Sequence, residues 1–268
     1  MKKLEHLSEI FKAYDSFIID LWGVMHDGFK LNPEALKVVD NLLKNKKKIT
    51  FLSNAPRPNA NVIKFLKKLN MKDEYLKYVL TSGEAAVSSL KEKKFGEYFY
   101  HLGPERDKPL FNGLEKNVTT LEKSQFILCT GLFDDKKEDL NFYKKLLENS
   151  KKKKLICTNP DLTVYKGQTK EYCAGSVADI FQSMGGEVIY FGKPYPEVYN
   201  LCIKKNENNF IIGDNLNTDI KGANNINADS LFILDGVHRD EYSDENKLDD
   251  LMKKYKVHSK YFQKKLCW

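Results

Sequence analysis

The segment SFIIDLWGVMHDG, residues 16–28, changes from apolar residues to charged residues and glycine within a few positions. A short apolar run bounded by such residues is typical of a strand that is buried on both faces of a sheet. We therefore expect a buried strand over residues 16–21. Asp20 lies where this strand ends, which places a carboxylate at its carboxyl end.

The same succession of strand, loop and helix recurs along the chain. Residues 33–44 and 60–70 have apolar side chains at helical spacing, and KITFLS, residues 48–53, predicts the strand between them. A helix over 82–93 is expected to begin with Ser82 as its N-cap. Further strands are expected at 78–81, 98–102, 125–129, 154–158, 188–191, 210–213 and 230–234. Strands that alternate with helices form parallel sheets, so the sequence predicts an α/β fold.

The overall composition is that of a folded, soluble protein. Hydrophobic residues make up 41% of the 268 residues and charged residues 30%, which excludes a disordered or collagen-like chain. No apolar run of about 18 residues occurs, so we expect no membrane span. The N-terminal residues lack the apolar run of a secretory signal, and the five cysteines show no CxxC spacing. We therefore expect a cytoplasmic protein without disulfides or a zinc site.

The basic residues are nearly all lysines. Only three arginines occur, Arg57, Arg106 and Arg239, against 41 lysines, and the formal net charge is +7. Proteins that read nucleic acids usually rely on arginine for contacts with bases and phosphates. The lysines here lie in short runs ahead of apolar segments, so we interpret them as solvated and expect no nucleic-acid partner. A positive field nevertheless favours anionic substrates.

Polar side chains directly follow several of the expected strands, at positions that a parallel sheet brings to one edge. They are Asp20, Ser53 and Asn54, Lys193 in GKP (192–194), and Asp214 and Asp219 in GDNLNTD (213–219). In parallel α/β folds the working residues gather at this edge, where the strand order reverses. Carboxylates hold a hard cation such as Mg²⁺, while hydroxyl and ammonium groups hold phosphoryl oxygens. The set therefore indicates phosphate chemistry.

These motifs resemble those of the haloacid dehalogenase-like hydrolases of class IIA, a branch that includes p-nitrophenyl phosphatases, pyridoxal phosphatases and nucleotide monophosphatases. The resemblance covers nearly the whole chain. It is carried by FIIDLWGVMHDG (17–28), ITFLSNAPRP (49–58), TSGEAA (81–86), ICTNPD (156–161), the stretch 173–199 that contains GKP, and FIIGDNLNTDIKGANNIN (210–227). GKP followed by GDNxxTD is the most specific combination.

The resemblance implies a Rossmann-like parallel-sheet core with an inserted α/β cap domain of the C2 type. The core would comprise residues 1–81 and 187–268, and the cap residues 82–186, with a sheet that contains 98–102, 125–129 and 154–157. A cap that closes over the site excludes water and selects the leaving group. Caps of this kind often pair in the resembling family, which makes a homodimer through the cap a plausible assembly.

The resemblance also implies a role for each residue around the phosphoryl group. Asp20 would be the nucleophile that forms an aspartyl-phosphate. Ser53 and Asn54 would bind the transferring phosphoryl group, at a site to which Trp22 also belongs. Lys193 would neutralise the phosphoryl charge and steady Asp20. The implied substrate is a small phosphorylated metabolite.

The implied cofactor is Mg²⁺. Asp20 and Asp214 would hold it together with the backbone carbonyl of Trp22. Asp219 would support the metal through water or through contacts outside its immediate ligands. The chain would then be a Mg²⁺-dependent hydrolase of small phosphate monoesters.

Trp22 departs from the family pattern. Phosphatases of this superfamily generally carry a second aspartate two residues after the nucleophile, as general acid and base. An indole offers only an N–H donor, and general acid–base catalysis contributes roughly 10²–10⁴-fold. His26 and Asp27 are alternative proton carriers, or they only shape the turn before Gly28. A phosphate-binding or regulatory protein with little turnover therefore remains the alternative function.

Overall fold

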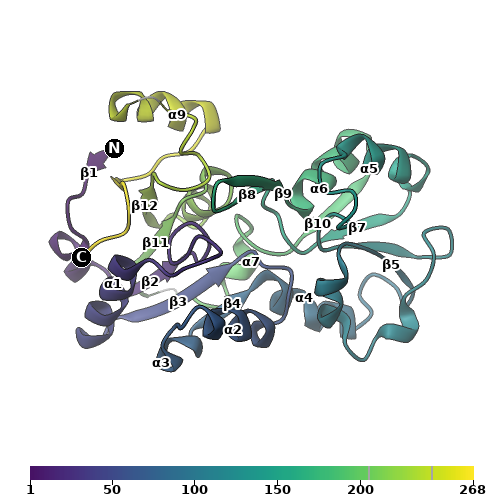
Figure 1. Ribbon diagram of the computed structural model, residues 1–268, viewed down its shortest axis with the longest axis horizontal. Coiled ribbons are helices and arrows are strands. Elements are labelled where there is room, and N and C mark those ends of the chain that lie inside the picture. The colour runs from purple at the N-terminus through teal and green to yellow at the C-terminus, as the bar shows by residue number, and fades with distance from the viewer. Residues whose placement is uncertain (205, 243) are drawn as a thin grey trace.

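A seven-stranded parallel sheet forms the larger part of the computed structural model, which describes residues 1–204, 206–242 and 244–268 (Figure 1). Its strands, in spatial order, are β1 (Lys2–Lys3), β13 (Tyr261–Gln263), β12 (Asp229–Ile233), β11 (Asn209–Gly213), β2 (Ser16–Ile19), β3 (Lys48–Ser53) and β4 (Val79–Thr81). The chain runs outward from β2 through β3 to β4, and outward from β11 through β12 to β13. The strand order therefore reverses between β2 and β11, where open parallel sheets bind their ligands.

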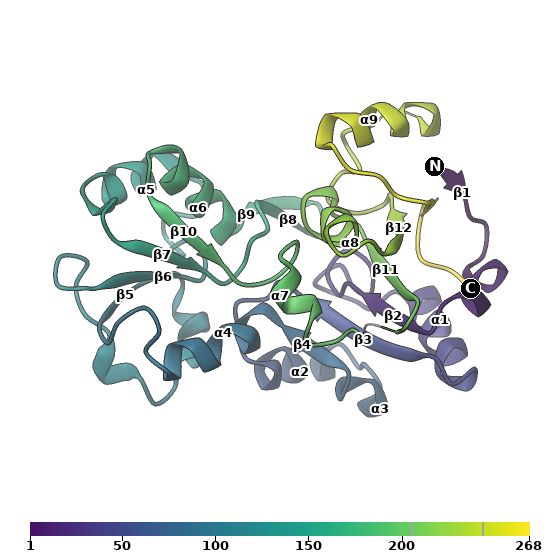
Figure 2. The same cartoon turned by 180° about the vertical axis from the view of Figure 1, so that it is seen from behind.

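Alternate residues of the central strands pack against different helices because successive side chains of a strand point to opposite faces. Phe17 and Ile19 of β2 belong to an apolar cluster with α1 (Pro33–Lys44) and α2 (Asn59–Lys68). Ile18 lies in another cluster, with α7 (Pro196–Tyr199) and α8 (Lys221–Asn225). Helices thus cover both faces of this sheet (Figure 2), which explains why β2 is entirely buried.

The other helices of this part lie at its margins. The single turn α3 (Asp73–Leu76) precedes β4, and α9 (Leu248–Tyr255) packs on the end of the sheet that contains β12. No helix among the described ranges is both long and apolar enough to cross a membrane.

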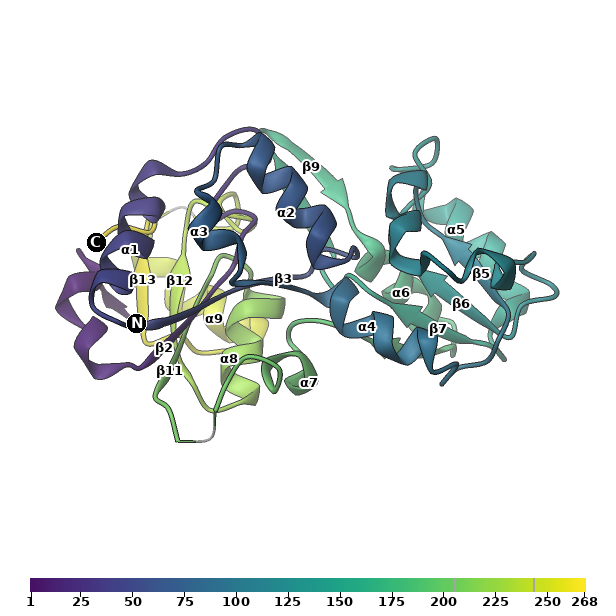
Figure 3. The same ribbon diagram turned by 90° about the horizontal axis from the view of Figure 1, so that it is seen from below.

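A second parallel sheet forms the smaller unit, which we call the cap. Its order is β10 (Glu187–Tyr190), β7 (Lys154–Cys157), β6 (Phe126–Cys129) and β5 (Phe99–Leu102). One face packs on α5 (Leu140–Leu147) and α6 (Ala174–Ser183), and the other packs on α4 (Ser82–Lys91). Seen from below, α4 and a strand of the hairpin formed by β8 (Thr163–Lys166) and β9 (Thr169–Tyr172) lie between the two sheets (Figure 3). The expected α/β core with an inserted α/β cap is confirmed.

Two expectations need correction where core and cap meet. The division at residue 187 assigned the strand after it to the core, but β10 pairs with β7 at the edge of the cap sheet. An apolar run identifies a strand without identifying its neighbour, so the return to the core comes after Tyr190.

Thr81, not Ser82, caps α4, since its Oγ1 accepts from the backbone N–H of Glu84 at 3.0 Å. The Ser82 hydroxyl instead donates to the carbonyl of Thr158 in the cap at 2.5 Å.

Candidate active site

Lys193 lies between two carboxylates at the point where the strand order reverses. Asp20 directly follows β2, and the Lys193 Nζ is 2.5 Å from its Oδ1 and 2.7 Å from the Oδ1 of Asp219. The exposed fractions of Lys193, Asp20 and Asp219 are 2%, 7% and 1%. Burial alone would lower the pKa of Lys193, but the adjacent carboxylates raise it well above its usual value. The lysine is therefore a fixed positive charge.

Asp214, which directly follows β11, completes a group of three buried carboxylates with Asp20 and Asp219. One oxygen from each lies within 4.8 Å of the others. Burial raises the pKa of Asp20 and of Asp214, and Lys193 opposes the rise. When all three carboxylates are ionised, one ammonium leaves them with excess negative charge in a buried place, and the donors are all oxygen. Such a set fits a hard divalent cation.

The two acidic residues after β11 differ in how many of their oxygens the protein uses. The Oδ2 of Asp219 accepts from the backbone N–H of Asn215 at 3.1 Å, while its Oδ1 faces Lys193. The Oδ2 of Asp214 accepts from the backbone N–H of Val237 at 2.8 Å. Asp219 thus has both oxygens occupied by protein donors, which suits a supporting position.

Asn54 has a role that the sequence did not predict. Its Oδ1 accepts from the backbone N–H of Lys193 at 2.8 Å, and its Nδ2 donates to the Lys193 carbonyl at 3.1 Å. Gly192 permits this approach, because its φ is +117° and a Cβ there would lie 2.5 Å from the Asn54 Oδ1. The Asn54 side chain therefore positions Lys193. Ser53 Oγ accepts from the Ala55 N–H at 3.2 Å, and its hydroxyl donates to no acceptor among the described residues, so its hydrogen is available to a ligand.

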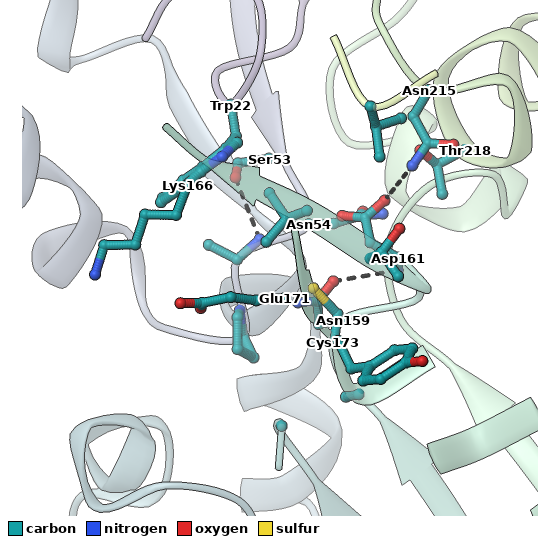
Figure 4. A pocket seen from close by; sticks show the side chains of 18 of the residues that line it. Trp22, Ser53, Asn54, Asn159, Asp161, Lys166, Glu171, Cys173, Asn215 and Thr218 are labelled. Atoms are coloured by element: carbon teal, nitrogen blue, oxygen red, sulfur yellow. Dashed lines mark hydrogen bonds between the residues drawn. The ribbon is translucent and has the colours of Figure 1, made fainter. Parts of the chain in front are cut away.

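A cavity of about 370 Å³ connects these residues with the cap. Sequence reasoning missed most of its cap-side lining, which includes Asp161, Lys166, Glu171, Arg106 and Asp107. Figure 4 shows Asp161 reaching across to Asn215, whose Nδ2 donates to its Oδ1 at 3.1 Å. The ICTNPD motif thus makes a turn, through Asn159 and the Asp161 N–H, and also joins cap to core. Only long-range contacts bring these residues together, so local patterns carry no signal for them.

Trp22 contacts the cap hairpin. Its indole N–H donates to the carbonyl oxygen of Tyr165 in β8 at 2.5 Å. Its ring lies parallel to that of Phe65, with centroids 6.4 Å apart, and also lines the cavity. The Trp22 side chain thus holds the hairpin.

His26 and Asp27 build the turn after Trp22 and do not line the cavity. The Nδ1 of His26 accepts from the Gly28 N–H at 3.1 Å, and burial lowers the pKa of His26 to about 4. The Oδ1 of Asp27 accepts from the N–H groups of Phe29 and Lys30 at 3.0 and 2.9 Å. Of the two interpretations of these residues, the geometry favours the structural one.

We expect Trp22→Phe to loosen the hairpin, because phenylalanine keeps a ring but loses the N–H. Loss of one hydrogen bond of about 1 kcal/mol should speed local opening roughly fivefold. Trypsin cleavage after Lys166 or Lys170, followed by mass spectrometry, measures this opening. Trp268→Phe is the matched control, since Trp268 packs on Phe11, far from the hairpin in the fold. Equal cleavage rates for wild type and Trp22→Phe would contradict the assignment.

Comparisons with known proteins agree with this geometry. A family model described as haloacid dehalogenase-like hydrolase matches residues 17–115, and a second, HAD-hydrolase-like model matches residues 190–256. An acid sugar phosphatase of Staphylococcus haemolyticus is 26% identical over 242 residues, which cover 84% of this chain and 87% of that protein.

Solved structures extend the likeness over the full length. A haloacid dehalogenase-like hydrolase from Brucella suis has a TM-score of 0.85 at 27% identity and covers 98% of this chain and 99% of its own. A p-nitrophenyl phosphatase from Archaeoglobus fulgidus has a TM-score of 0.71 at 20% identity, covers 94% and 96%, and shows the fold alone. Because the two family models together match more than half of the chain, the chain belongs to the haloacid dehalogenase-like hydrolases.

Proposed function

We propose that the protein hydrolyses small phosphate monoesters through an aspartyl-phosphate on Asp20. The observation that carries the proposal is the contact of the Lys193 Nζ with Asp20 at 2.5 Å inside a buried group of three carboxylates. Burial raises the pKa of Asp20 to about 8, and the fixed positive charge of Lys193 opposes this rise and so favours the ionised form that attacks phosphorus. Lys193 also stabilises the negative charge of the phosphoryl group in the transition state.

The reaction has two displacements at phosphorus. An oxygen of Asp20 attacks, the ester P–O bond breaks, and the leaving oxygen departs with the electron pair and takes up a proton. Water then attacks the phosphorus of the aspartyl-phosphate, and the P–O bond to Asp20 breaks and returns its electron pair to the carboxylate. The attacking water releases one proton, which replaces the proton taken up by the leaving oxygen, and inorganic phosphate leaves. Ser53 would donate its free hydroxyl hydrogen to a phosphoryl oxygen, and the hairpin held by Trp22 would exclude bulk water.

Mg²⁺ is the proposed cofactor. Asp20, Asp214 and the carbonyl of Trp22 would hold it, and Asp219, whose oxygens are occupied by protein donors, would support it. When bound, the cation would draw charge from the phosphoryl oxygens and screen the carboxylates. Phosphate release from p-nitrophenyl phosphate, measured with millimolar Mg²⁺ and again after treatment with EDTA, tests both the activity and its metal dependence.

Trp22 supports a second candidate, a phosphate-binding protein with little turnover. At the position where the family pattern has an aspartate as general acid and base, its indole cannot carry the proton. Turnover with Mg²⁺ on several monoesters, by a preparation free of other phosphatases, would rule this candidate out. Binding of phosphate without turnover on any ester would establish it instead.

We expect aryl phosphates to be hydrolysed at least about 100-fold faster than alkyl phosphates, since a phenolate leaves with little help from a proton donor. The ratio of kcat for p-nitrophenyl phosphate and glycerol 3-phosphate, both at saturating concentration, measures this dependence. Equal values would show that another group donates the proton, and would make Trp22 a packing residue for the hairpin alone.

A further inference from the structure

The three arginines of this chain all lie where core and cap meet. Arg57 and Arg106 line the cavity that contains Asp20, and Arg239 lines the adjoining pocket beside the hairpin. The chain uses lysine at its 41 other basic positions. Arginine differs from lysine in presenting a planar fork of donors that matches carboxylate and phosphate groups, and in stacking on aromatic rings. Its confinement to this region indicates that the fork is needed there.

Arg239 has a sufficient explanation in the hairpin. Its guanidinium lies 3.8 Å from the ring centroid of Tyr165, and its Nη2 donates to the carbonyl of Gly167 and the Oε1 of Gln168 at 3.3 and 3.2 Å. Both the stacking and the paired donors are used within the protein. Arg239 therefore holds the cap hairpin together with Trp22, through the face of its guanidinium and its Nη2.

Arg57 and Arg106 have only part of their donors in use. The Nε of Arg57 donates to the Oδ1 of Asp107 at 2.5 Å, and the Nη1 of Arg106 donates to the Oδ1 of Asp134 at 2.5 Å. Within the described part of the chain, the two terminal nitrogens of Arg57 form no hydrogen bond. Each aspartate fixes one side of a guanidinium and leaves the remaining donors available to a ligand in the cavity.

The two arginines come from different parts of the fold, the core and the cap. Arg57 follows β3, four residues after Ser53, while Arg106 lies in the cap segment Glu105–Phe111. Asp107 is buried, with 2% exposure, so the orientation of Arg57 is set by a group that cannot move into solvent. A ligand that contacts both arginines would therefore bridge core and cap inside the cavity that also contains Asp20.

Other cationic groups of the same cavity add to this field. Lys137, 3.4 Å from the Oδ1 of Asp134, and Lys166 of the hairpin both line it. The carboxylates of Asp107, Asp134 and Glu171 offset part of the positive charge. Because this offset is large, the affinity for an anion must come mainly from direct hydrogen bonds with the guanidinium groups. The net positive potential of the cavity contributes less.

We propose that Arg57 and Arg106 form a second oxyanion-binding subsite, so that the preferred substrates are small phosphate monoesters with another acidic group, a carboxylate or a second phosphate, at their far end. That these ligands are substrates rests on the proposed function, whereas their binding to the two arginines does not. Such a ligand places two anionic groups in one cavity: a dianion at Lys193 and a second anion at the two arginines.

Binding of non-hydrolysable phosphonates tests the subsite without turnover. Titration calorimetry on the full chain, at fixed ionic strength and fixed free Mg²⁺, compares propylphosphonate with 3-phosphonopropionate and propane-1,3-bisphosphonate. The second acidic group should tighten Kd by about 10- to 100-fold, the usual range for hydrogen bonds between charged groups. The two diacids distinguish a carboxylate from a phosphate as the preferred group. Equal Kd values for all three ligands would overturn the proposal.

Variants distinguish direct hydrogen bonds to the guanidinium from general electrostatic attraction. Arg106→Gln should remove most of the gain in affinity, and Arg106→Lys should restore only part of it, because a point charge lacks the fork. Arg57 is changed only to lysine, since removal of its charge would leave Asp107 buried without a partner. Lys123→Gln, an exposed change of equal charge on the cap, is the matched control and should keep the gain. Equal losses in Arg106→Gln and Lys123→Gln would overturn the proposal.

Kinetics distinguish failure of this inference from failure of the proposed function. The ratio of kcat/KM for 3-phosphoglycerate and glycerol 3-phosphate should fall about 10-fold or more in Arg106→Gln, mainly through KM. Turnover of p-nitrophenyl phosphate without any preference for diacids would overturn the subsite alone. Tight binding of diacids with no turnover of any ester would overturn the phosphatase and leave the subsite standing.

Discussion

Asp20→Asn is expected to lower kcat for p-nitrophenyl phosphate by about 10⁴-fold or more, the scale on which loss of a nucleophile acts. An amide oxygen carries no charge, so it attacks phosphorus poorly and binds a divalent cation weakly. The side chain keeps its size, and Lys193 keeps its contact with Asp219 at 2.7 Å. We therefore expect the fold to survive, with the circular dichroism spectrum of the wild type.

The control for this variant is Asp27→Asn. Asparagine can accept the same two backbone N–H bonds at the turn, so kcat should stay within about twofold of the wild type. A large loss in Asp27→Asn would identify Asp27 as the missing proton donor. Substantial activity in Asp20→Asn would contradict the aspartyl-phosphate mechanism.

Lys193→Met is expected to lower both activity and stability. In the metal-free protein the change leaves two carboxylates, Asp20 and Asp219, buried without their cation, and breaking a buried pair in this way costs about 3–5 kcal/mol. Loss of the charge at the phosphoryl group should also lower kcat by about 10³-fold. Urea unfolding in EDTA and phosphate release with Mg²⁺ measure the two effects.

The stability loss should depend on pH. Burial raises the pKa of Asp20 and Lys193 lowers it, so Lys193→Met raises the folded-state pKa further. A carboxyl whose pKa is higher in the folded state binds protons more tightly there, so the folded state loses stability as pH rises above about 4, the usual unfolded value. Because the pKa of Asp20 in the wild type is itself raised to about 8, both proteins lose stability alike up to that pH, and the difference in unfolding free energy between wild type and variant should be larger at pH 9.5 than at pH 7. A difference that shrinks with rising pH would contradict this electrostatic account.

The sequence predicts local structure well where a strand or helix carries its own signals. The bounds Pro33–Lys44 of α1 and Lys48–Ser53 of β3 agree with expectation. Asn32 caps α1 by accepting from the Glu34 N–H, and Pro33 fits its first turn. Strand ends likewise placed Asp20 and Asp214 at one edge, because parallel strands share their direction.

Contacts between distant segments could not be predicted in this way. The partner of β10, the bond from Trp22 to Tyr165 and the pairing of Arg57 with Asp107 join parts of the chain that no local pattern relates. The roles assigned to Ser53, Asn54, Lys193 and the metal-binding residues remain predictions. So do the homodimer through the cap and the cytoplasmic location.

The position of Lys193 matters for anyone who exchanges caps between enzymes of this family. Only Phe191 and Gly192 separate the edge strand β10 of the cap from Lys193, whose ammonium must meet Asp20 in the core. One inserted or deleted residue at that junction would shift the lysine along the chain by about 3.5 Å, more than the length of its contact with Asp20. A chimera should therefore be spliced within β10 or earlier, and the recipient should keep its own residues from 191 to 194.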